Sequence, residues 1–147
     1  MSLTPPLVAI MEGRKVRPRR ERVPIPKELE LHMPVAKLLR EHCLPDWRWT
    51  HFPAGEKRDM RAATKLKQMG LHRGWPDFLL FSPFDSRQIH GLECKRIGAG
   101  LTDEQAEWGA WVIHHGGKYA VARTMDDVLW AFEQWGCLRI KYEPRRT

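Results

Sequence analysis

Short apolar runs predict β-strands in the middle and the second half of the chain. The run Phe78-Leu79-Leu80-Phe81 is unbroken and of strand length, as expected for a strand covered on both faces. Pro83 follows this run and ends it. Residues 90–96 predict a second central strand, and residues 47–52 and 119–122 predict two more. The pattern therefore predicts a sheet assembled from segments far apart in the chain.

Apolar residues also recur at helical spacing in four segments. The first helix is expected to begin near Pro26 and to extend to Leu44, and Pro34 inside it implies a kink or a later start. In the second, Asp59 can cap a helix that Gly70 ends. Three residues are expected to form its apolar face: Ala63, Leu66 and Met69.

The last two helices have clear start and stop signals. Residues 102–105 match a capping box, and Gly116 ends the helix that follows. Thr124 can cap the final helix, which Gly136 ends and whose inward residues are expected to be Val128, Leu129 and Phe132. The order is helix, strand, helix, two strands, helix, strand, helix. This order predicts a mixed central sheet flanked by helices, in the α/β class.

The 147 residues suit one compact domain with short tails. We expect a basic, disordered arm at residues 1–26, a folded domain at 27–137 and a basic tail at 138–147. No run approaches the roughly 18 apolar residues of a membrane span, and no signal peptide opens the chain. The three cysteines are far apart and odd in number, which indicates buried thiols in a reducing compartment. We therefore expect a cytoplasmic protein.

The net charge of +7 lies in the two tails, and the segment between them sums to zero. Within that segment the charge is segregated. Residues 48–73 carry seven basic residues against two acids, whereas residues 100–135 carry two against six. One side of the domain should therefore be positive, as a phosphate-binding surface requires. On charge alone, ordinary solvated faces explain the pattern equally well.

The candidate chemistry lies on the two central strands. Side chains alternate along a strand, so Glu93 and Lys95 should share one face, and Asp77 opens the preceding strand. Two carboxylates and an ammonium group would then meet at one end of the sheet. Such carboxylates can hold Mg²⁺, and a lysine beside the metal can position or deprotonate an attacking water. An ordinary ion pair at the end of a strand is the structural alternative.

Other chemistries find little support. Two histidine-containing pairs, His42-Cys43 and His114-His115, lack a second pair at zinc-finger spacing. The chain has no Gly-rich loop followed by Lys-Ser/Thr, and Gly98-Ala-Gly100 is too short for a dinucleotide-binding loop. No serine has a nucleophile-elbow context.

Several motifs occur in one order and together resemble the VRR-NUC family of the PD-(D/E)xK nuclease superfamily. They are HFPAGEKR at residues 51–58, the helix up to Gly70, Gly74-Trp-Pro-Asp77, Glu93-Cys-Lys95 and Thr102 to Gln105. The resemblance covers about residues 28–136. It implies a restriction-endonuclease-like core and hydrolysis of phosphodiester bonds with a divalent metal. It also implies a homodimer when such a domain stands alone.

The resemblance assigns roles to particular residues. Asp77 and Glu93 would be metal ligands, with the carbonyl of Cys94 as a third, and Lys95 would be the catalytic lysine. Glu30 matches the family's upstream acid, and Glu28 is a rival for that position. A solvated acid in the first turn of a helix explains Glu30 equally well. Gln105 matches a family glutamine in the active site, and a purely structural capping role is the alternative.

Basic residues flank the approach to Asp77. Those expected to contact phosphate are Lys57, Arg58, Arg73, Lys67 and Arg96. Arg61 and Lys65, on the predicted helix, have simple solvation as their alternative. Trp75 adjoins the site and can stack on a base, although a place in the core or at its rim explains it better.

These inferences converge on a nuclease that uses Mg²⁺ or Mn²⁺. By resemblance its substrate is branched DNA, such as a flap or a four-way junction, which a dimer would cleave endonucleolytically. Two alternatives stay open. A DNA-binding module can keep the fold without the chemistry, and an RNA-directed nuclease can use the same residues because the core chemistry does not distinguish the sugar.

Overall fold

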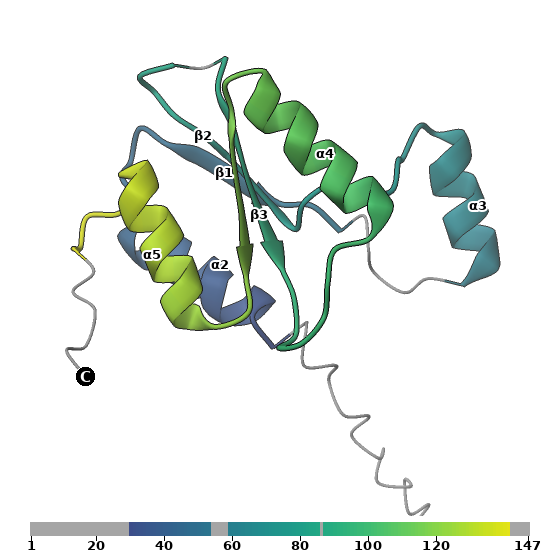
Figure 1. Cartoon of the computed structure of the whole chain (residues 1–147), viewed down its shortest axis with the longest axis horizontal. Coiled ribbons are helices and arrows are strands. Elements are labelled where there is room, and N and C mark those ends of the chain that lie inside the picture. Colours follow the sequence, from purple (N-terminus) through teal and green to yellow (C-terminus); the bar gives the residue numbers. More distant parts are fainter. Residues whose placement is uncertain (1–29, 54–58, 86, 142–147) are drawn as a thin grey trace, which may run out of the picture.

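The computed structural model describes residues 30–53, 59–85 and 87–141. In this part of the chain four strands form one sheet and four helices flank or adjoin it (Figure 1). The elements, in chain order, are α2 (His32–His42), β1 (Arg48–His51), α3 (Met60–Gln68), β2 (Phe78–Phe81), β3 (Ile89–Cys94), α4 (Asp103–His114), β4 (Lys118–Ala122) and α5 (Met125–Trp135). The predicted order of elements and the mixed α/β class are confirmed.

The sheet has the order β1-β2-β3-β4. The two pairs β1–β2 and β2–β3 are antiparallel, whereas β3 and β4 are parallel and connected through α4. Strand β3 is thus central, and it is buried along almost its whole length. In β2 the first three residues are buried, but Phe81 is 37% exposed, so the expected cover on both faces stops before the end of the strand.

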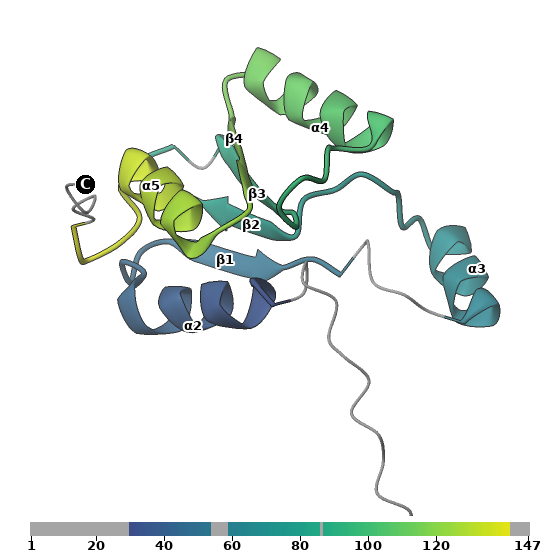
Figure 2. The ribbon, with the colours of Figure 1, turned by 60° about the horizontal axis from the view of Figure 1, so that its bottom comes forward.

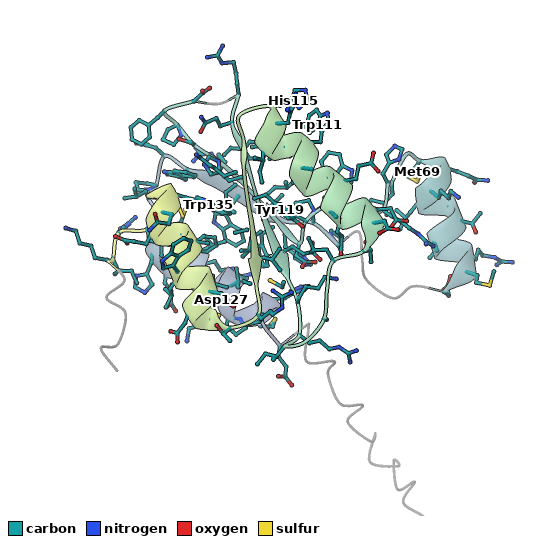
Figure 3. The ribbon with its side chains drawn as sticks, in the orientation of Figure 1. Met69, Trp111, His115, Tyr119, Asp127 and Trp135 are labelled. Atoms are coloured by element: carbon teal, nitrogen blue, oxygen red, sulfur yellow. The ribbon has the colours of Figure 1, made fainter. Side chains whose placement is uncertain are left out.

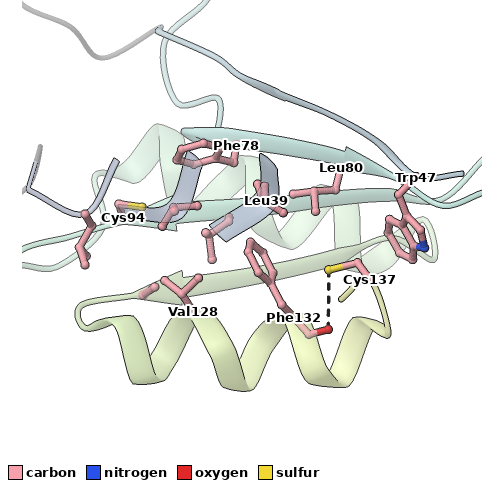
Figure 4. Close-up of a cluster of buried hydrophobic side chains, with 12 residues drawn as sticks. Leu39, Trp47, Phe78, Leu80, Cys94, Val128, Phe132 and Cys137 are labelled. Carbon is pink, nitrogen blue, oxygen red and sulfur yellow. Dashed lines mark hydrogen bonds between the residues drawn. The ribbon is translucent and has the colours of Figure 1, made fainter. Parts of the chain in front are cut away.

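Helices α2 and α5 cover one face of the sheet (Figure 2). Val35 and Leu39 from α2 meet Val128 and Phe132 from α5 against the buried residues of β2, β3 and β4, and Leu92 is fully buried there. Figure 4 shows this cluster from the side. Because the cluster joins both ends of the described chain to its centre, it is the main apolar core.

Helix α4 covers the opposite face, and two glycines let it approach closely (Figure 2). A Cβ on Gly91 of β3 would lie 2.8 Å from the Trp108 ring, and one on Gly109 of α4 would lie 2.6 Å from the Tyr119 ring. These distances are shorter than a carbon–carbon contact allows. Both glycines therefore set the spacing between α4 and the sheet.

The predicted caps are confirmed. Asp59 accepts a hydrogen bond from the amide of Ala62, and capping boxes begin α4 and α5 at Thr102 and Thr124. Gly136 ends α5 in the left-handed conformation, with a φ of 69°. Helix α2 begins at His32, so Pro34 falls in its first turn, where a missing amide hydrogen costs no helical hydrogen bond.

Helix α3 has an apolar face that is not buried. None of its residues is buried, and it lies apart from the sheet in both views (Figures 1 and 2). The predicted apolar face of Ala63, Leu66 and Met69 is largely exposed, and Met69 itself is 72% exposed. The pattern was helical, but amphipathicity alone did not indicate whether another element covers the apolar side.

Two further findings concern the remaining expectations. No disulfide joins the three cysteines; Cys94 and Cys137 are buried and Cys43 is half-buried. None of the helices in the described part of the chain is long and apolar enough to cross a membrane. Leu138 pairs with Cys43 in an isolated bridge, so the start of the C-terminal tail contacts the domain, and the arm at residues 1–26 lies outside the described residues.

Candidate active site at the ends of strands β2 and β3

Asp77 lies where β2 begins, beside the end of β3. Phe78 pairs with Leu92, and continuing this antiparallel register by one residue sets Asp77 opposite Glu93. The Asp77 carbonyl accepts a hydrogen bond of 2.7 Å from the Phe52 amide, so the ladder with β1 also extends to this residue. The Asp77 side chain binds the backbone at the end of β3: its Oδ2 accepts a 2.7 Å hydrogen bond from the amide of Cys94.

The loop before Asp77 is held against the start of α4. Gly74 has a φ of +86°, and a Cβ there would lie 2.7 Å from the backbone of Glu104. Trp75 packs between the rings of Phe52 and Trp108, and Pro76 is fully buried. Only glycine suits position 74, because its φ is positive and because a Cβ there would clash with Glu104. Trp75 is 37% exposed, in agreement with a place at the rim of the core.

Glu93 and Lys95 share the face of the sheet that α4 covers, as strand alternation predicts. Lys95 Nζ lies 3.7 Å from Glu93 Oε1, and the side chains are 9% and 2% exposed. Lys95 follows the last residue of β3, and its amide donates to the carbonyl of Ala122 in the neighbouring strand. The burial of two opposite charges at this spacing gives a strong and poorly screened interaction.

Gln105 caps α4 and also contacts Glu93. Its Oε1 accepts from the amide of Thr102 at 2.9 Å, which completes the capping box. Its Nε2 donates to Glu93 Oε1 at 2.7 Å. The same amide therefore fixes the first turn of α4 and orients the buried carboxylate. Glu93 Oε1 is thus shared between an amide donor and the Lys95 ammonium.

Tyr119 is a neighbour of this site that the sequence analysis missed. It pairs with Gly91 across β3 and β4, on the same face as Glu93. Its hydroxyl is buried and has no hydrogen-bond partner among the described residues. Burial raises the pKa of Tyr119 far above its usual value, and the negative charges of Glu93 and Asp77 raise it further. The hydroxyl therefore stays protonated. Its position follows from the parallel pairing of Tyr119 with Gly91, which no local sequence pattern indicates. Figure 3 labels Tyr119 beside the sheet.

On the other face, His32 and Cys94 approach Asp77, and the sequence analysis missed this grouping as well. His32 Nε2 lies 3.4 Å from Asp77 Oδ2. Possible ligand atoms of His32, Asp77 and Cys94 all lie within 4.8 Å of one another. Among the described residues, no other group of three His, Cys, Asp or Glu side chains is this close. The three positions are too far apart in the sequence to form a local motif.

Of the two candidate upstream acids, only Glu30 lies among the described residues. Glu30 is exposed and lines a shallow depression together with Arg96, Ile97 and Arg123. Glu30 is not among the three residues whose possible ligand atoms lie within 4.8 Å of one another, and its expected role as an upstream ligand stays a prediction. Glu28 lies outside the described residues. The solvated-acid interpretation of Glu30 agrees with its exposure.

Three of the five basic candidates lie among the described residues, and all three are exposed. Arg73 is exposed in the loop that leads to Asp77, Lys67 is exposed on α3, and Arg96 is exposed directly after Lys95. Lys57 and Arg58 lie outside the described residues. Helix α3 itself carries three cations and no acid, and all three are exposed: Arg61, Lys65 and Lys67. The loop and the helix thus present positive charge to solvent.

Carboxylate oxygens are the ligands that hard divalent cations prefer. Asp77 and Glu93 supply carboxylate oxygens from adjacent strands, and Cys94 stands between Glu93 and Lys95 at the end of β3. Magnesium sites commonly use one or two carboxylates and complete the coordination with water and substrate phosphate.

Comparisons of the chain with protein families, with curated proteins and with solved structures find no match.

Proposed function

We propose that the protein is a metal-dependent nuclease with a restriction-endonuclease-like core, as its resemblance to the VRR-NUC family implies. The observation that carries the proposal is the environment of Glu93. This carboxylate is 2% exposed, lies opposite Asp77 in the sheet register, and is contacted by Lys95 and Gln105. Burying a charged pair is expensive, and a fold that needs only stability gains little from it. A catalytic role accounts for the cost.

The donor chemistry of the site fits Mg²⁺ or Mn²⁺. Asp77 and Glu93 would hold the ion, and the carbonyl of Cys94 is the third ligand that the resemblance implies. When bound, such an ion offsets the negative charge of the phosphate under attack. The remaining coordination positions would be open to water and to the substrate, since the protein supplies few ligands.

Lys95 and Gln105 prepare this site. Lys95 stands beside Glu93 with its ammonium group 3.7 Å from Oε1, where it can orient a water for attack on phosphorus and donate a proton or hydrogen bond to the oxygen on which negative charge develops. Gln105 fixes the Glu93 carboxylate by a 2.7 Å hydrogen bond. Because Gln105 also caps α4, the carboxylate is held by a rigid element rather than by a mobile side chain.

Exposed cations next to the site are suited to phosphate contact. Arg73 adjoins the Asp77 loop and Arg96 follows Lys95, while α3 extends positive charge away from the sheet. We assign these residues to the backbone of the nucleic acid, where arginine and lysine position the strand without reading its sequence. Branched DNA as the substrate and a homodimer as the active form follow from the resemblance alone.

A cleavage assay tests the proposal. Linear duplex, flap and four-way junction DNA and a single-stranded RNA are incubated with the protein, with and without Mg²⁺ or Mn²⁺. We expect metal-dependent cleavage of a branched DNA, and a loss of at least about 100-fold in Asp77→Asn. Glu41→Gln, at an exposed acid on α2, is the matched control and should keep full activity. Binding without cleavage by the wild type would leave only a DNA-binding module, and preferred cleavage of RNA would reassign the substrate.

Phosphate contact is tested separately by the salt dependence of binding. Neutralising Arg73 in Arg73→Gln should weaken binding and reduce the slope of log K against log salt by about one. Lys37→Gln provides the control, because Lys37 is paired with Glu41 on α2. An unchanged slope for Arg73→Gln would remove this residue from the interface.

A further inference from the structure

Three side chains of different chemistry lie close together at the ends of β2 and β3 and at the start of α2. They are the imidazole of His32, the carboxylate of Asp77 and the thiol of Cys94, with possible ligand atoms within 4.8 Å of one another. His32 Nε2 is buried and has no hydrogen-bond partner among the described residues, although Asp77 Oδ2 lies 3.4 Å away. A buried imidazole nitrogen beside a carboxylate and a thiol needs an explanation.

The mixture of donors is unlike that of a magnesium site. Mg²⁺ prefers oxygen ligands in an octahedral arrangement, whereas nitrogen and sulfur donors favour Zn²⁺ and neighbouring transition ions. Zinc sites commonly use four ligands at about 2.0–2.3 Å, and a site with three protein ligands leaves one position for water. Donor atoms around such an ion lie about 3–4 Å apart, so the observed cluster needs only a small contraction.

The three residues come from rigid parts of the fold. His32 is the first residue of α2, Asp77 is tied to β1 and β3 by hydrogen bonds, and Cys94 ends β3. Cys94 is fully buried, but the side chains of His32 and Asp77 are 14% and 15% exposed. His32 and Asp77 are therefore the members of the group that reach the surface.

We propose that His32, Asp77 and Cys94 form a second metal site, selective for a transition ion such as Zn²⁺ or Co²⁺. Binding replaces the proton of the Cys94 thiol, which passes to solvent, by a metal–sulfur bond. No change of oxidation state is involved. The imidazole of His51, whose ring centre lies 5.0 Å from that of His32, forms part of the surroundings of this site.

The second site shares Asp77 with the proposed catalytic site. A carboxylate drawn towards the nitrogen and sulfur ligands is no longer placed for Mg²⁺ beside Glu93. Transition ions should therefore inhibit the nuclease by occupying Asp77 from the opposite face of the sheet. This regulatory consequence rests on the proposed function, whereas the binding site itself does not.

The test is a titration of the purified full-length protein with Co²⁺, followed by competition with Zn²⁺. Cobalt bound to a thiolate gives a sulfur-to-metal charge-transfer band, so the readout is independent of catalysis. Cys94→Ala and His32→Gln remove one ligand each. Cys137→Ala is the matched control, because Cys137 is a second fully buried cysteine at the other end of the same core (Figure 4). Burial raises the pKa of Cys137 to about 12, which keeps this thiol protonated.

We expect the band and tight Zn²⁺ binding in the wild type and in Cys137→Ala. Cys94→Ala should lose the band, and both ligand variants should bind Zn²⁺ at least about tenfold more weakly. Circular dichroism of each variant confirms that it is folded. The His32 side chain is 14% exposed, whereas Cys94 is fully buried. His32→Gln should therefore disturb packing less, and it provides the test if Cys94→Ala does not fold. An identical band and affinity in folded Cys94→Ala or His32→Gln would overturn the proposal.

Nuclease assays with added Zn²⁺ separate this inference from the proposed function. Each protein is compared with its own activity in Mg²⁺, and Zn²⁺ should inhibit the wild type more than His32→Gln. Cys94-dependent metal binding by a protein that cleaves nothing supports the second site and removes the nuclease. Cleavage in Mg²⁺ without Cys94-dependent metal binding supports the nuclease and overturns the second site.

Discussion

The two faces of β3 carry different kinds of residue, although they alternate along six positions of one strand. The face towards α2 and α5 contains Leu92 and Cys94 in an apolar cluster. The face towards α4 contains Gly91 and Glu93, followed by Lys95 after the strand. One face therefore stabilises the fold through apolar burial, and the other holds a buried ion pair that adds little stability.

This contrast separates stability from activity at neighbouring positions. A substitution at Leu92 should act through the folded population alone, whereas one at Glu93 or Lys95 should act on the chemistry even when the fold is intact. Adjacent residues belong to the same strand. A difference between the effects of substituting them therefore comes from the face of the sheet on which each side chain lies.

The largest effect is expected on breaking the ion pair. Lys95→Met should lower cleavage by at least about 100-fold and destabilise the fold by about 3 kcal/mol, because Glu93 loses its buried cationic neighbour. Adding Glu93→Gln should restore most of the stability without restoring activity. Urea unfolding and single-turnover cleavage measure the two quantities. An active double variant would show that the pair is structural only.

The opposite face provides the complementary result. Leu92 is fully buried, so Leu92→Ala should cost about 2–5 kcal/mol in the free energy of unfolding. Below its unfolding temperature the variant should cleave at a rate close to that of the wild type, since Leu92 faces away from Glu93 and Lys95. Thermal unfolding and cleavage are measured on the same preparation. A large loss of activity in the fully folded variant would contradict the separation of the two faces.

Much of the fold could be predicted from local patterns. The unbroken run at Phe78 to Phe81 and the caps at Thr102 and Thr124 act within a few residues, so their signals survive in the sequence alone. The shared face of Glu93 and Lys95 follows from strand alternation. These predictions required no knowledge of which element lies next to which.

The parts that failed or were missed depend on distant contacts. The apolar side of α3 gave a helical signal, yet no described element buries it. Tyr119 and His32 reached the site through the pairing of β3 with β4 and the position of α2, which no local pattern encodes. Gln105 could not be assigned to one role because its two bonds, to Thr102 and to Glu93, are made at once.

Gln105→Glu tests a residue that takes part in both the cap of α4 and the candidate site. A carboxylate can still accept from the Thr102 amide and complete the cap, but it cannot donate to Glu93 and brings a second negative charge beside it. We expect activity to fall about tenfold with α4 intact, as a misoriented carboxylate should act on the chemistry. Gln105→Ala is the comparison, because it loses both bonds. Equal activity in wild type and Gln105→Glu would limit Gln105 to capping.

The smallest effect concerns a titratable group on the apolar face. His90 is buried between the rings of Trp47 and Trp135. Burial lowers the pKa of His90 in the folded protein, and the positive charge of Lys118 lowers it further, against two backbone hydrogen bonds that raise it. Because the unfolded chain takes up a proton near pH 6.5 and the folded chain only at lower pH, stability should fall as the pH drops below about 6.5.

His90→Phe tests this linkage, since a phenyl ring suits the same aromatic surroundings and does not titrate. The free energy of unfolding is measured by urea at several pH values between 5 and 7.5, and the difference between variant and wild type is compared. Other histidines titrate in both proteins and cancel from this difference. The wild type should lose more stability than His90→Phe on acidification. Parallel pH curves would mean that His90 accepts its proton in the folded state as readily as in the unfolded chain, and the apolar face would then tolerate a charge.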